Sequence, residues 1–369
     1  MRYGKNKKIE KLLKTYQNEG VFSGCGVAFS HLQDKVFKRY YAFNGTCNTS
    51  PFSRKVDENV FFDLASLTKP LVTVLSLLAL VQQDRLDLEK SIYNYLPFVP
   101  VVDKKDIRVV DLVRHTSGLP PHRPYYEVLS KKTPCINLEQ VVHLILKEKL
   151  QNRPGCKYVY SDLDYMLLGY IIAIVSGETI ASYWRRKICK PLNLSHCFYL
   201  YNEKEKSPTR RSFVETGQYP WSAALEHGDV HDDNCRVIGS TAGHAGLFAT
   251  LEGVIALCED ILLTFIGNRD HPSYRREDLI FLLTKREEKQ WAYGFDVPTG
   301  SMPSCGRRFS AKTVGHLGYT GTSFWVDLEK NNVAVLLTNR VIYGVYGQKI
   351  REMRPVVHDA LVSSYEERE

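Results

Sequence analysis

The chain has 369 residues, of which 44% are hydrophobic and 24% are charged. This composition is ordinary for a folded globular protein and excludes a disordered, collagen-like or coiled-coil chain. The net charge is +8, but six basic residues and one acidic residue among the first fourteen account for +5 of it. The rest of the chain carries only +3, which argues against a broad nucleic-acid-binding surface.

The N-terminal segment is the first predicted element, because Ile9, Leu12, Leu13 and Tyr16 follow the spacing of one helix face. Lysines interrupt this apolar pattern, so the segment does not read as a secretory signal. Its cations suit contact with an anionic membrane surface, but we favour a helix that packs on the protein and exposes its lysines. Nine cysteines without a CxxC pair indicate free thiols. We therefore expect a cytoplasmic protein, or a periplasmic one if a leader was removed.

Two apolar, β-rich segments, residues 24–30 and 36–43, follow this helix. The polar residues 33–35 separate them, and this order predicts a β-hairpin. A second hairpin is predicted near the other end of the chain, where residues 323–327 and 333–338 flank a polar turn. The strands of the fold are therefore expected to come from both ends of the chain.

The segment between the hairpins is mainly helical. A long apolar helix is predicted from Ser66 to about Gln83, and residues 84–234 contain further segments of helical period. The apolar run 71–81 is shorter than the roughly 17–25 residues of a bilayer span, so this helix should be buried. The chain is predicted to close with a helix that Pro355 opens.

This order of elements predicts an α+β fold, in which a mainly helical domain interrupts an antiparallel sheet domain flanked by terminal helices. Residues 1–70 and 236–369 are assigned to the discontinuous sheet domain, and residues 71–235 to the helical domain. The motifs described next place the active site at the junction of the two.

The first motif with chemical content is Ser66-Leu67-Thr68-Lys69. Ser66 and Lys69 are about one helical turn apart on the same face, so the lysine amine can reach the serine hydroxyl. A serine becomes a nucleophile when a nearby base accepts its proton. Pro70 is tolerated only near a helix start, which places Ser66 at a helix N-terminus. The motif alone fits equally a capping serine beside a solvated lysine.

Two further segments carry groups that suit acyl transfer. Tyr160 is a candidate base or proton relay, and residues 161–162 are candidates to cap the following helix. Residues 315–322 contain three glycines, which let a substrate approach the backbone closely. In this segment the N–H of Tyr319 is a candidate partner for the N–H of Ser66 in an oxyanion hole.

Together these segments resemble the serine β-lactamase and penicillin-binding-protein superfamily, specifically the branch around class C β-lactamases, DD-peptidases and related esterases. The family motifs SxxK, Tyr-x-Asn and Lys-Thr-Gly correspond in order to segments that begin at Ser66, Tyr160 and His316. Three more segments are similar to family segments: residues 112–120, 243–248 and 336–340. The resemblance covers roughly residues 20–365. It implies a β-lactamase/DD-peptidase-like fold without a cofactor or metal.

The resemblance also implies roles for individual residues. Ser66 is the acylated nucleophile, Lys69 its partner base, and Tyr160 the second base that protonates the leaving group. The division of work between Lys69 and Tyr160 stays open, because the acylation base is disputed among relatives. The residues expected to contact substrate are Asp162, His316, Gly318, Tyr319, Asn339 and Arg340.

Two departures from the family pattern concern charge. Asp162 replaces the usual asparagine and adds a negative charge, and His316 replaces the lysine of Lys-Thr-Gly. With a reference pKa of about 6.5, a histidine is mostly neutral at pH 7. We expect Arg340 to supply the cation that binds a substrate carboxylate. The alternative is that Arg340 pairs with an acidic residue such as Asp327 at the sheet edge.

The favoured function is a serine hydrolase that forms an acyl-enzyme, specifically a DD-carboxypeptidase acting on peptidoglycan precursors or muropeptides, with β-lactams as covalent ligands. The alternatives are an esterase or β-lactamase of the same superfamily, or a penicillin-binding sensor without turnover. Residues 230–234 and His244 contain clustered histidine and acidic side chains. They lack the histidine spacing of helical zinc sites, so we favour a structural loop or a lining of the substrate cleft there over a metal site.

Overall fold

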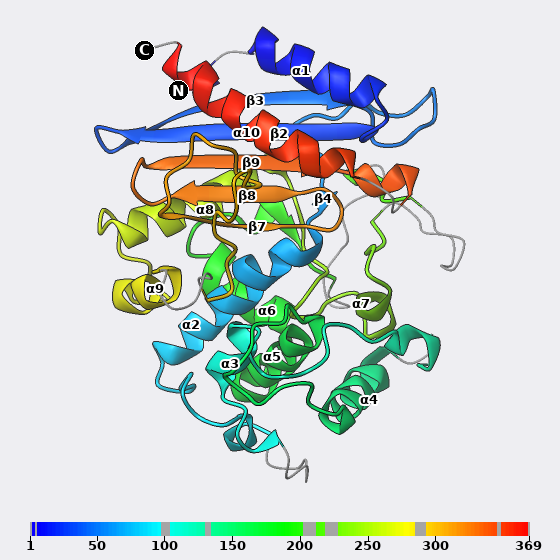
Figure 1. Cartoon of the computed structure of the whole chain (residues 1–369), viewed down its shortest axis with the longest axis vertical. Helices are drawn as coiled ribbons and strands as arrows, with labels where there is room; N and C mark the ends of the chain where they lie inside the picture. Colours follow the sequence, from blue (N-terminus) through cyan, green and yellow to red (C-terminus); the bar gives the residue numbers. More distant parts are fainter. Residues whose placement is uncertain are drawn as a thin grey trace.

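The computed structural model describes residues 2–3, 6–96, 104–129, 134–201, 212–217, 228–284, 293–344 and 348–367. Its centre is a six-stranded sheet with the strand order β1-β3-β2-β9-β8-β7 (Figure 1). The strands are β1 (Arg2–Tyr3), β2 (Gly24–Gln33), β3 (Val36–Gly45), β7 (Thr313–Leu317), β8 (Ser323–Asp327) and β9 (Asn332–Thr338). All neighbours are antiparallel except β1 and β3. The predicted α+β fold with an antiparallel sheet is confirmed.

Both predicted hairpins are present. Gln33 pairs with Val36, so β2 and β3 are joined by a two-residue turn in which Asp34 and Lys35 have φ of 49° and 64°. Two positive φ values match the twist of a tight hairpin. The second hairpin joins β8 to β9. Strand β2 also pairs directly with β9, so the two ends of the chain meet in the middle of the sheet.

The terminal helices α1 (Lys7–Asn18) and α10 (Lys349–Glu366) cover one face of the sheet (Figure 1). Ile9 and Leu13 are fully buried in a cluster with residues of α10 and of the sheet. The N-terminal segment is thus a helix that packs on the sheet, as favoured from its sequence.

The prediction that Pro355 opens the last helix is wrong. The helix starts at Lys349, and Pro355 lies inside it. A proline inside a helix generally costs about 3 kcal/mol, because it removes a hydrogen bond and clashes with the preceding turn. Here Ile350 and Met353, at 3% and 0% exposure, bury the extra N-terminal turn against the sheet and offset that cost.

The remaining helices lie on the opposite side of the sheet (Figure 1). These are α2 (Leu75–Val81), α3 (Val109–Val113), α4 (Pro134–Lys147), α5 (Asp162–Ser176), α6 (Ile180–Trp184), α7 (Asp233–Val237), α8 (Leu251–Phe265) and α9 (Arg276–Leu283). Of these, α8 packs directly against β2, β8 and β9. A small second sheet has the order β4 (Phe62–Asp63), β6 (Phe248–Ala249) and β5 (Phe198–Tyr199). Strand β9 therefore has core on both faces, which is why its sequence is continuously apolar rather than alternating.

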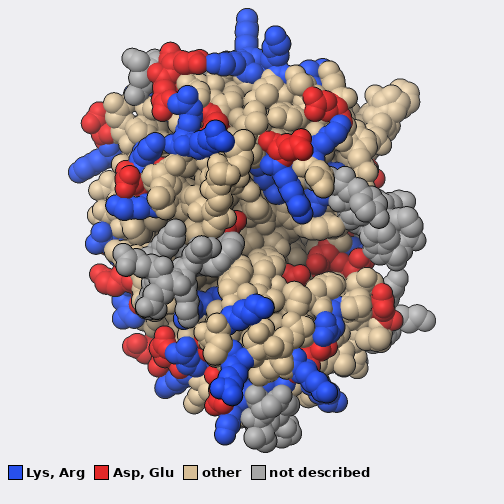
Figure 2. Space-filling view, in the orientation of Figure 1, with Lys and Arg blue, Asp and Glu red and all other residues tan. Residues whose placement is uncertain are grey.

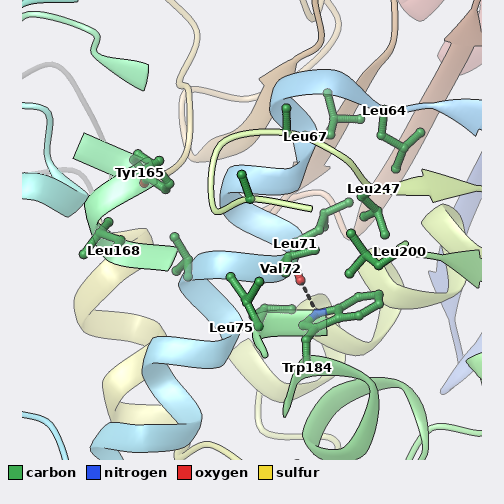
Figure 3. Packing of buried hydrophobic residues seen from close by; sticks show 14 of the residues in the cluster. Leu64, Leu67, Leu71, Val72, Leu75, Tyr165, Leu168, Trp184, Leu200 and Leu247 are labelled. Carbon is green, nitrogen blue, oxygen red and sulfur yellow. Dashed lines mark hydrogen bonds between the residues drawn. The ribbon is translucent and has the colours of Figure 1, made fainter. Parts of the chain in front are cut away.

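The long helix predicted from Ser66 is divided into three geometries. A 3-10 turn covers Ala65–Leu67, a π-helix covers Lys69–Val74, and regular α-helix α2 begins only at Leu75. Pro70 has no N–H to donate, so it disturbs regular α-helical bonding in this turn. The indole of Trp184 donates to the carbonyl of Leu71 at 2.6 Å within a tightly packed apolar core (Figure 3). This hydrogen bond and the surrounding core thus fix the helical turns that follow Ser66.

Two properties of the described chain bear on earlier expectations. The eight described cysteines are all free, and Cys156 is the one that is exposed. Among the described helices no single one is long and apolar enough to span a membrane; α5 and the helical segment after it pass only as a pair bent by 72°. Basic and acidic side chains are interspersed over the face shown in Figure 2.

Candidate active site

A cavity of about 920 Å³ opens between strand β7 at the edge of the sheet and the helical part of the molecule. Its wall contains six of the residues that the sequence singled out: Ser66, Tyr160, His316, Gly318, Tyr319 and Arg340. Four different segments of the chain contribute these residues, and the fold brings them together.

Ser66 lies in the 3-10 turn directly after β4. The residue before it, Ala65, has a φ of 46°, which is strained for a residue with a side chain. The carboxylate of Asp63 accepts a hydrogen bond from the N–H of Ala65 at 2.8 Å and holds this conformation. The turn therefore presents Ser66 at the cavity wall instead of burying it in a regular helix.

Lys69 is completely buried beneath Ser66. Its Nζ donates to Ser66 Oγ at 2.9 Å, to Asp162 Oδ1 at 2.7 Å and to the carbonyl of His244 at 3.2 Å. Three acceptors match the three N–H groups of an ammonium. Burial by itself lowers the pKa of Lys69, but the charge of Asp162, together with Tyr160, outweighs burial and raises that pKa above its ordinary value.

Asp162 is the first residue of α5, where the helix N-terminus favours a negative charge. Burial raises the pKa of Asp162, but Lys69, His122 and His244 outweigh this and hold it well below its ordinary value. His122 Nδ1 lies 3.8 Å from the second carboxylate oxygen. The carboxylate that replaces the family asparagine is therefore ionised and paired with Lys69.

Tyr160 borders both Ser66 and Lys69. Its ring lies 4.9 Å from Lys69 Nζ and packs on His115 with ring centroids 4.6 Å apart. The residue as a whole is 37% exposed, but desolvation of its hydroxyl raises the pKa of Tyr160, and the nearby Lys69 opposes this rise. At neutral pH the side chain is a phenol with a cationic neighbour.

Ser161 has a structural position, as the capping hypothesis expected. Its hydroxyl accepts from the N–H of Asp164 at the start of α5 and donates to the carbonyl of Pro120 at 2.6 Å. The side chain is fully buried. The N–H of Ser161 donates to His115 Nδ1 at 3.1 Å, which ties the 112–120 segment to α5.

His316 lies near the end of β7 and faces Tyr160, with ring centroids 6.1 Å apart. Burial, reinforced by Lys69, lowers the pKa of His316 to about 3, so the ring is neutral at pH 7. Nδ1 lies 2.9 Å from the carbonyl of Leu317. A carbonyl only accepts, so Nδ1 carries the proton and Nε2 is a hydrogen-bond acceptor. His316 therefore does not replace the positive charge of the family lysine.

Two backbone N–H groups, of Ser66 and Tyr319, form the candidate oxyanion hole. Within the described residues, neither amide has a hydrogen-bond acceptor. The loop after β7 is fixed next to the Ser66 turn, because Thr320 Oγ1 donates to the carbonyl of Asp63 at 2.6 Å and Thr322 Oγ1 to that of Leu64 at 3.2 Å. Both amides are therefore available to a substrate oxygen.

A family model described as Beta-lactamase matches residues 9–354 of this chain. The chain belongs to this family. Among curated proteins, it is 28% identical over 306 residues to a putative D-alanyl-D-alanine carboxypeptidase of Escherichia coli K12, covering 78% of this chain and 70% of that protein.

Solved structures place this Beta-lactamase-family chain in the serine β-lactamase and penicillin-binding-protein fold. The hydrolase EstCE1, described as having promiscuous acyltransferase activity, superposes with a TM-score of 0.71 at 20% identity over 95% of this chain and 98% of its own. A class C β-lactamase variant superposes with a TM-score of 0.70 at 19% identity over 96% of each chain.

The structure does not support a substrate contact for Asn339. Its Oδ1 accepts from the N–H groups of Ser23 and Gly24, and its Nδ2 donates to Ser23 Oγ and to the carbonyl of Glu215. The side chain is 1% exposed and all its hydrogen-bonding groups are used inside the protein. Asn339 therefore fixes the start of β2 against the end of β9.

Arg340 lies in the cavity wall, where its guanidinium stacks 4.6 Å from the ring of Tyr319 and its Nε donates to the carbonyl of Tyr319 at 2.6 Å. The alternative ion pair with Asp327 is wrong. The carboxylate of Asp327 instead accepts from Ser310 and from the backbone of the turn between β8 and β9.

The histidine and acidic cluster at residues 230–234 forms no candidate metal site among the described residues. His244 Nε2 instead lies 3.0 Å from Asp232, which caps α7, and the carbonyl of His244 accepts from Lys69. Sequence reasoning missed this carbonyl, and it missed His122 and Arg354. His244 lies in the segment 243–248, but nothing in that segment shows that its backbone carbonyl faces Lys69, and His122 and Arg354 belong to none of the segments singled out.

Proposed function

We propose that this Beta-lactamase-family protein is a D-Ala-D-Ala carboxypeptidase that acts on peptidoglycan precursors or fragments through an acyl-enzyme on Ser66. The observation that carries the proposal is the 2.9 Å contact between Lys69 Nζ and Ser66 Oγ beside Tyr160 in the cavity. The name of the Escherichia coli relative supports the choice of substrate.

In the proposed reaction the Lys69–Tyr160 pair, which is fully protonated at neutral pH, first loses one proton to solvent. Ser66 Oγ then attacks the carbonyl carbon of the scissile amide, and its proton passes to this pair. The N–H groups of Ser66 and Tyr319 stabilise the negative charge that develops on the carbonyl oxygen. The C–N bond then breaks, and the same proton is delivered to the leaving amine. Attack of water on the resulting ester releases the acid and restores the hydroxyl of Ser66.

The terminal carboxylate of such a peptide needs a cation, and His316 is neutral. We assign the carboxylate to Arg340, which stands in the cavity wall next to Tyr319. A guanidinium binds a carboxylate with two parallel hydrogen bonds and stays charged throughout the working pH range. Arg340→Ala is expected to raise the KM for carboxylate-ended peptides more than it raises the KM for neutral esters. Equal losses on both substrate classes would contradict this role.

A second candidate is an esterase or amidase whose substrates lack that carboxylate. The neutral His316 favours it, because the position that is a lysine in the family motif offers only an acceptor nitrogen here. Comparing kcat/KM for a D-Ala-D-Ala peptide with that for the matching neutral ester separates the two candidates. Replacing His316 by lysine should improve acylation by β-lactams if the site accepts carboxylates.

The decisive experiment labels one sample of the protein with a fluorescent penicillin, incubates a second, unlabelled sample with muropeptides and identifies the products by mass spectrometry. Continuous release of D-alanine supports the carboxypeptidase. Release that stops after one equivalent per protein indicates a penicillin-binding sensor, and labelling without any peptide product directs the search to esters.

A further inference from the structure

The loop of residues 318–322 has one tightly defined position beside Ser66. A Cβ atom added at Gly318 would lie 2.0 Å from Thr322 Oγ1 and 2.6 Å from the carbonyl oxygen of Leu64. The N–H of Gly318 donates to the carbonyl of Thr322 at 2.8 Å, which closes the loop. The loop is therefore packed against the nucleophile turn without room for a side chain at its first residue.

The peptide that links Gly318 to Tyr319 carries the second N–H of the oxyanion hole. In a trans peptide the carbonyl and the N–H point in opposite directions, and no peptide bond described in the chain is cis. Arg354 of α10 donates from Nη2 to the carbonyl of Gly318 at 2.8 Å and to that of Thr322 at 3.0 Å. Holding the carbonyl of Gly318 from the α10 side therefore fixes the direction of the N–H of Tyr319.

The charge of Arg354 is unusual for its position. The residue is only 6% exposed and lies in the cavity wall. Its Nε has no hydrogen-bond partner, and in the described parts of the chain no carboxylate forms an ion pair with it. Burial, together with Arg340 and Arg351, lowers the pKa of Arg354 to about 9, and the charge of Asp296 in the same cavity wall only partly opposes this. A buried cation without a directly paired carboxylate is costly, and one that persists favours a further anion at the site.

We propose that Arg354 is a positioning residue of the oxyanion hole, which orients and polarises the Gly318–Tyr319 peptide and gains a second nearby negative charge, besides that of Asp296, when the oxyanion forms. The inference rests on acyl transfer at Ser66. Its competitors are an anchor for the substrate carboxylate and a purely structural link between α10 and the loop.

Arg354→Met and Arg354→Lys separate these roles, with Arg308→Met as the control. Arg308 also bonds to α10, through Glu366 at 2.6 Å, but lies outside the cavity. Each variant is assayed with p-nitrophenyl acetate and with a D-Ala-D-Ala peptide, and its Tm is measured. Its second-order rate of labelling by a fluorophosphonate is also measured, because the phosphonyl oxygen occupies the same hole.

For Arg354→Met we expect kcat and the labelling rate to fall about 10–100-fold with KM within twofold on both substrates, below the roughly 10²–10³-fold loss of a direct donor. Arg354→Lys should retain more activity than Arg354→Met, and Arg308→Met should match the wild type. In a further variant, Arg354→Ala, guanidinium added to the assay should partly restore the activity. If Arg354→Met does not fold, Arg354→Lys serves as the test: a lower kcat with unchanged KM supports the proposal, and an unchanged kcat contradicts it.

A rise of KM confined to the peptide would overturn the proposal in favour of a carboxylate anchor. Unchanged kcat and labelling with a lower Tm would overturn it in favour of a structural link. Absence of labelling in the wild type would instead refute acyl transfer at Ser66, so the two failures are distinguishable.

Discussion

The acceptors around Lys69 determine which proton donors and acceptors the site has at neutral pH. Asp162 and the carbonyl of His244 can only accept, so they bind two N–H groups of Lys69 and leave the third to face Ser66. Asp162 also raises the pKa of both Lys69 and Tyr160. Neither side chain is deprotonated at pH 7, so transfer of the Ser66 proton becomes easier as the pH rises.

The first prediction follows from this charge arrangement. The rate of Ser66 acylation should rise with pH through the neutral range, and Asp162→Asn should move that rise to lower pH by about one unit. Removing a negative charge destabilises the Lys69 ammonium and stabilises the Tyr160 phenolate, so both pKa values fall. Fluorophosphonate labelling rates measured across pH test this. Asp233→Asn removes a carboxylate that pairs with Arg236 instead and should leave the profile in place.

Ser66→Ala should abolish labelling by β-lactams and fluorophosphonates and leave the fold intact. The change removes one hydroxyl at the cavity wall, so stability should shift by less than about 1 kcal/mol. Intact-mass spectrometry gives the labelling and circular dichroism gives the Tm. Retention of a covalent adduct on another serine would contradict the assignment of the nucleophile.

Lys69→Ala and Tyr160→Phe should each reduce turnover by roughly 10²–10⁴-fold, the usual contribution of general acid–base groups. The double variant should lose less than the product of the two, because both groups handle the same proton. Ser161→Ala is the matched control in the same segment, since its buried hydroxyl caps α5. We expect it to cost about 1 kcal/mol in stability and to keep turnover. A silent Tyr160→Phe would contradict the role of Tyr160.

At the scale of elements, the segment after Ser66 shows how local geometry serves the site. A regular helix from Ser66 would have placed Lys69 and the serine on one helical face without strain. The structure has a strained Ala65, a 3-10 turn and a π-helix instead. Departures of this kind are frequent at functional sites. The core around Trp184 and Leu71 holds the segment in this conformation.

The loop after β7 gives a prediction at the same scale. Gly318→Ala should abolish measurable acylation, because its Cβ would collide with Thr322 and Leu64 and push the N–H of Tyr319 away from the hole. The same overpacking should reduce stability by about 1–3 kcal/mol. Gly300→Ala is the control, since its φ of 72° strains an alanine but a Cβ there meets open space, so it should reduce stability and leave acylation unchanged. Normal labelling in Gly318→Ala would show that the loop position is not needed.

For the whole molecule, elements and side-chain pairs that depend on residues close together in the sequence are predictable. Hydrogen bonds and packing contacts between distant positions are not. Both hairpins, the N-terminal helix and the Ser66–Lys69 pair follow from local spacing. The structural role of Asn339 is not predictable from the sequence, because its partners Ser23 and Gly24 lie more than 300 positions away in the chain. Pro355 was misplaced because the buried contacts of Ile350 and Met353 extend the helix towards its N-terminus.

The pairing of β2 with β9 also has a consequence for the order of events during biosynthesis. Strand β9 is made about 300 residues after β2, which at typical synthesis rates is roughly 15–60 s later. Until then the nucleophile segment has emerged without its neighbouring sheet strands, and long-range strand pairing of this kind is slow. A nascent chain therefore carries Ser66 and Lys69 long before it can carry an oxyanion hole. The protein is therefore expected to gain acylating activity only after β9 has been translated and has paired with β2.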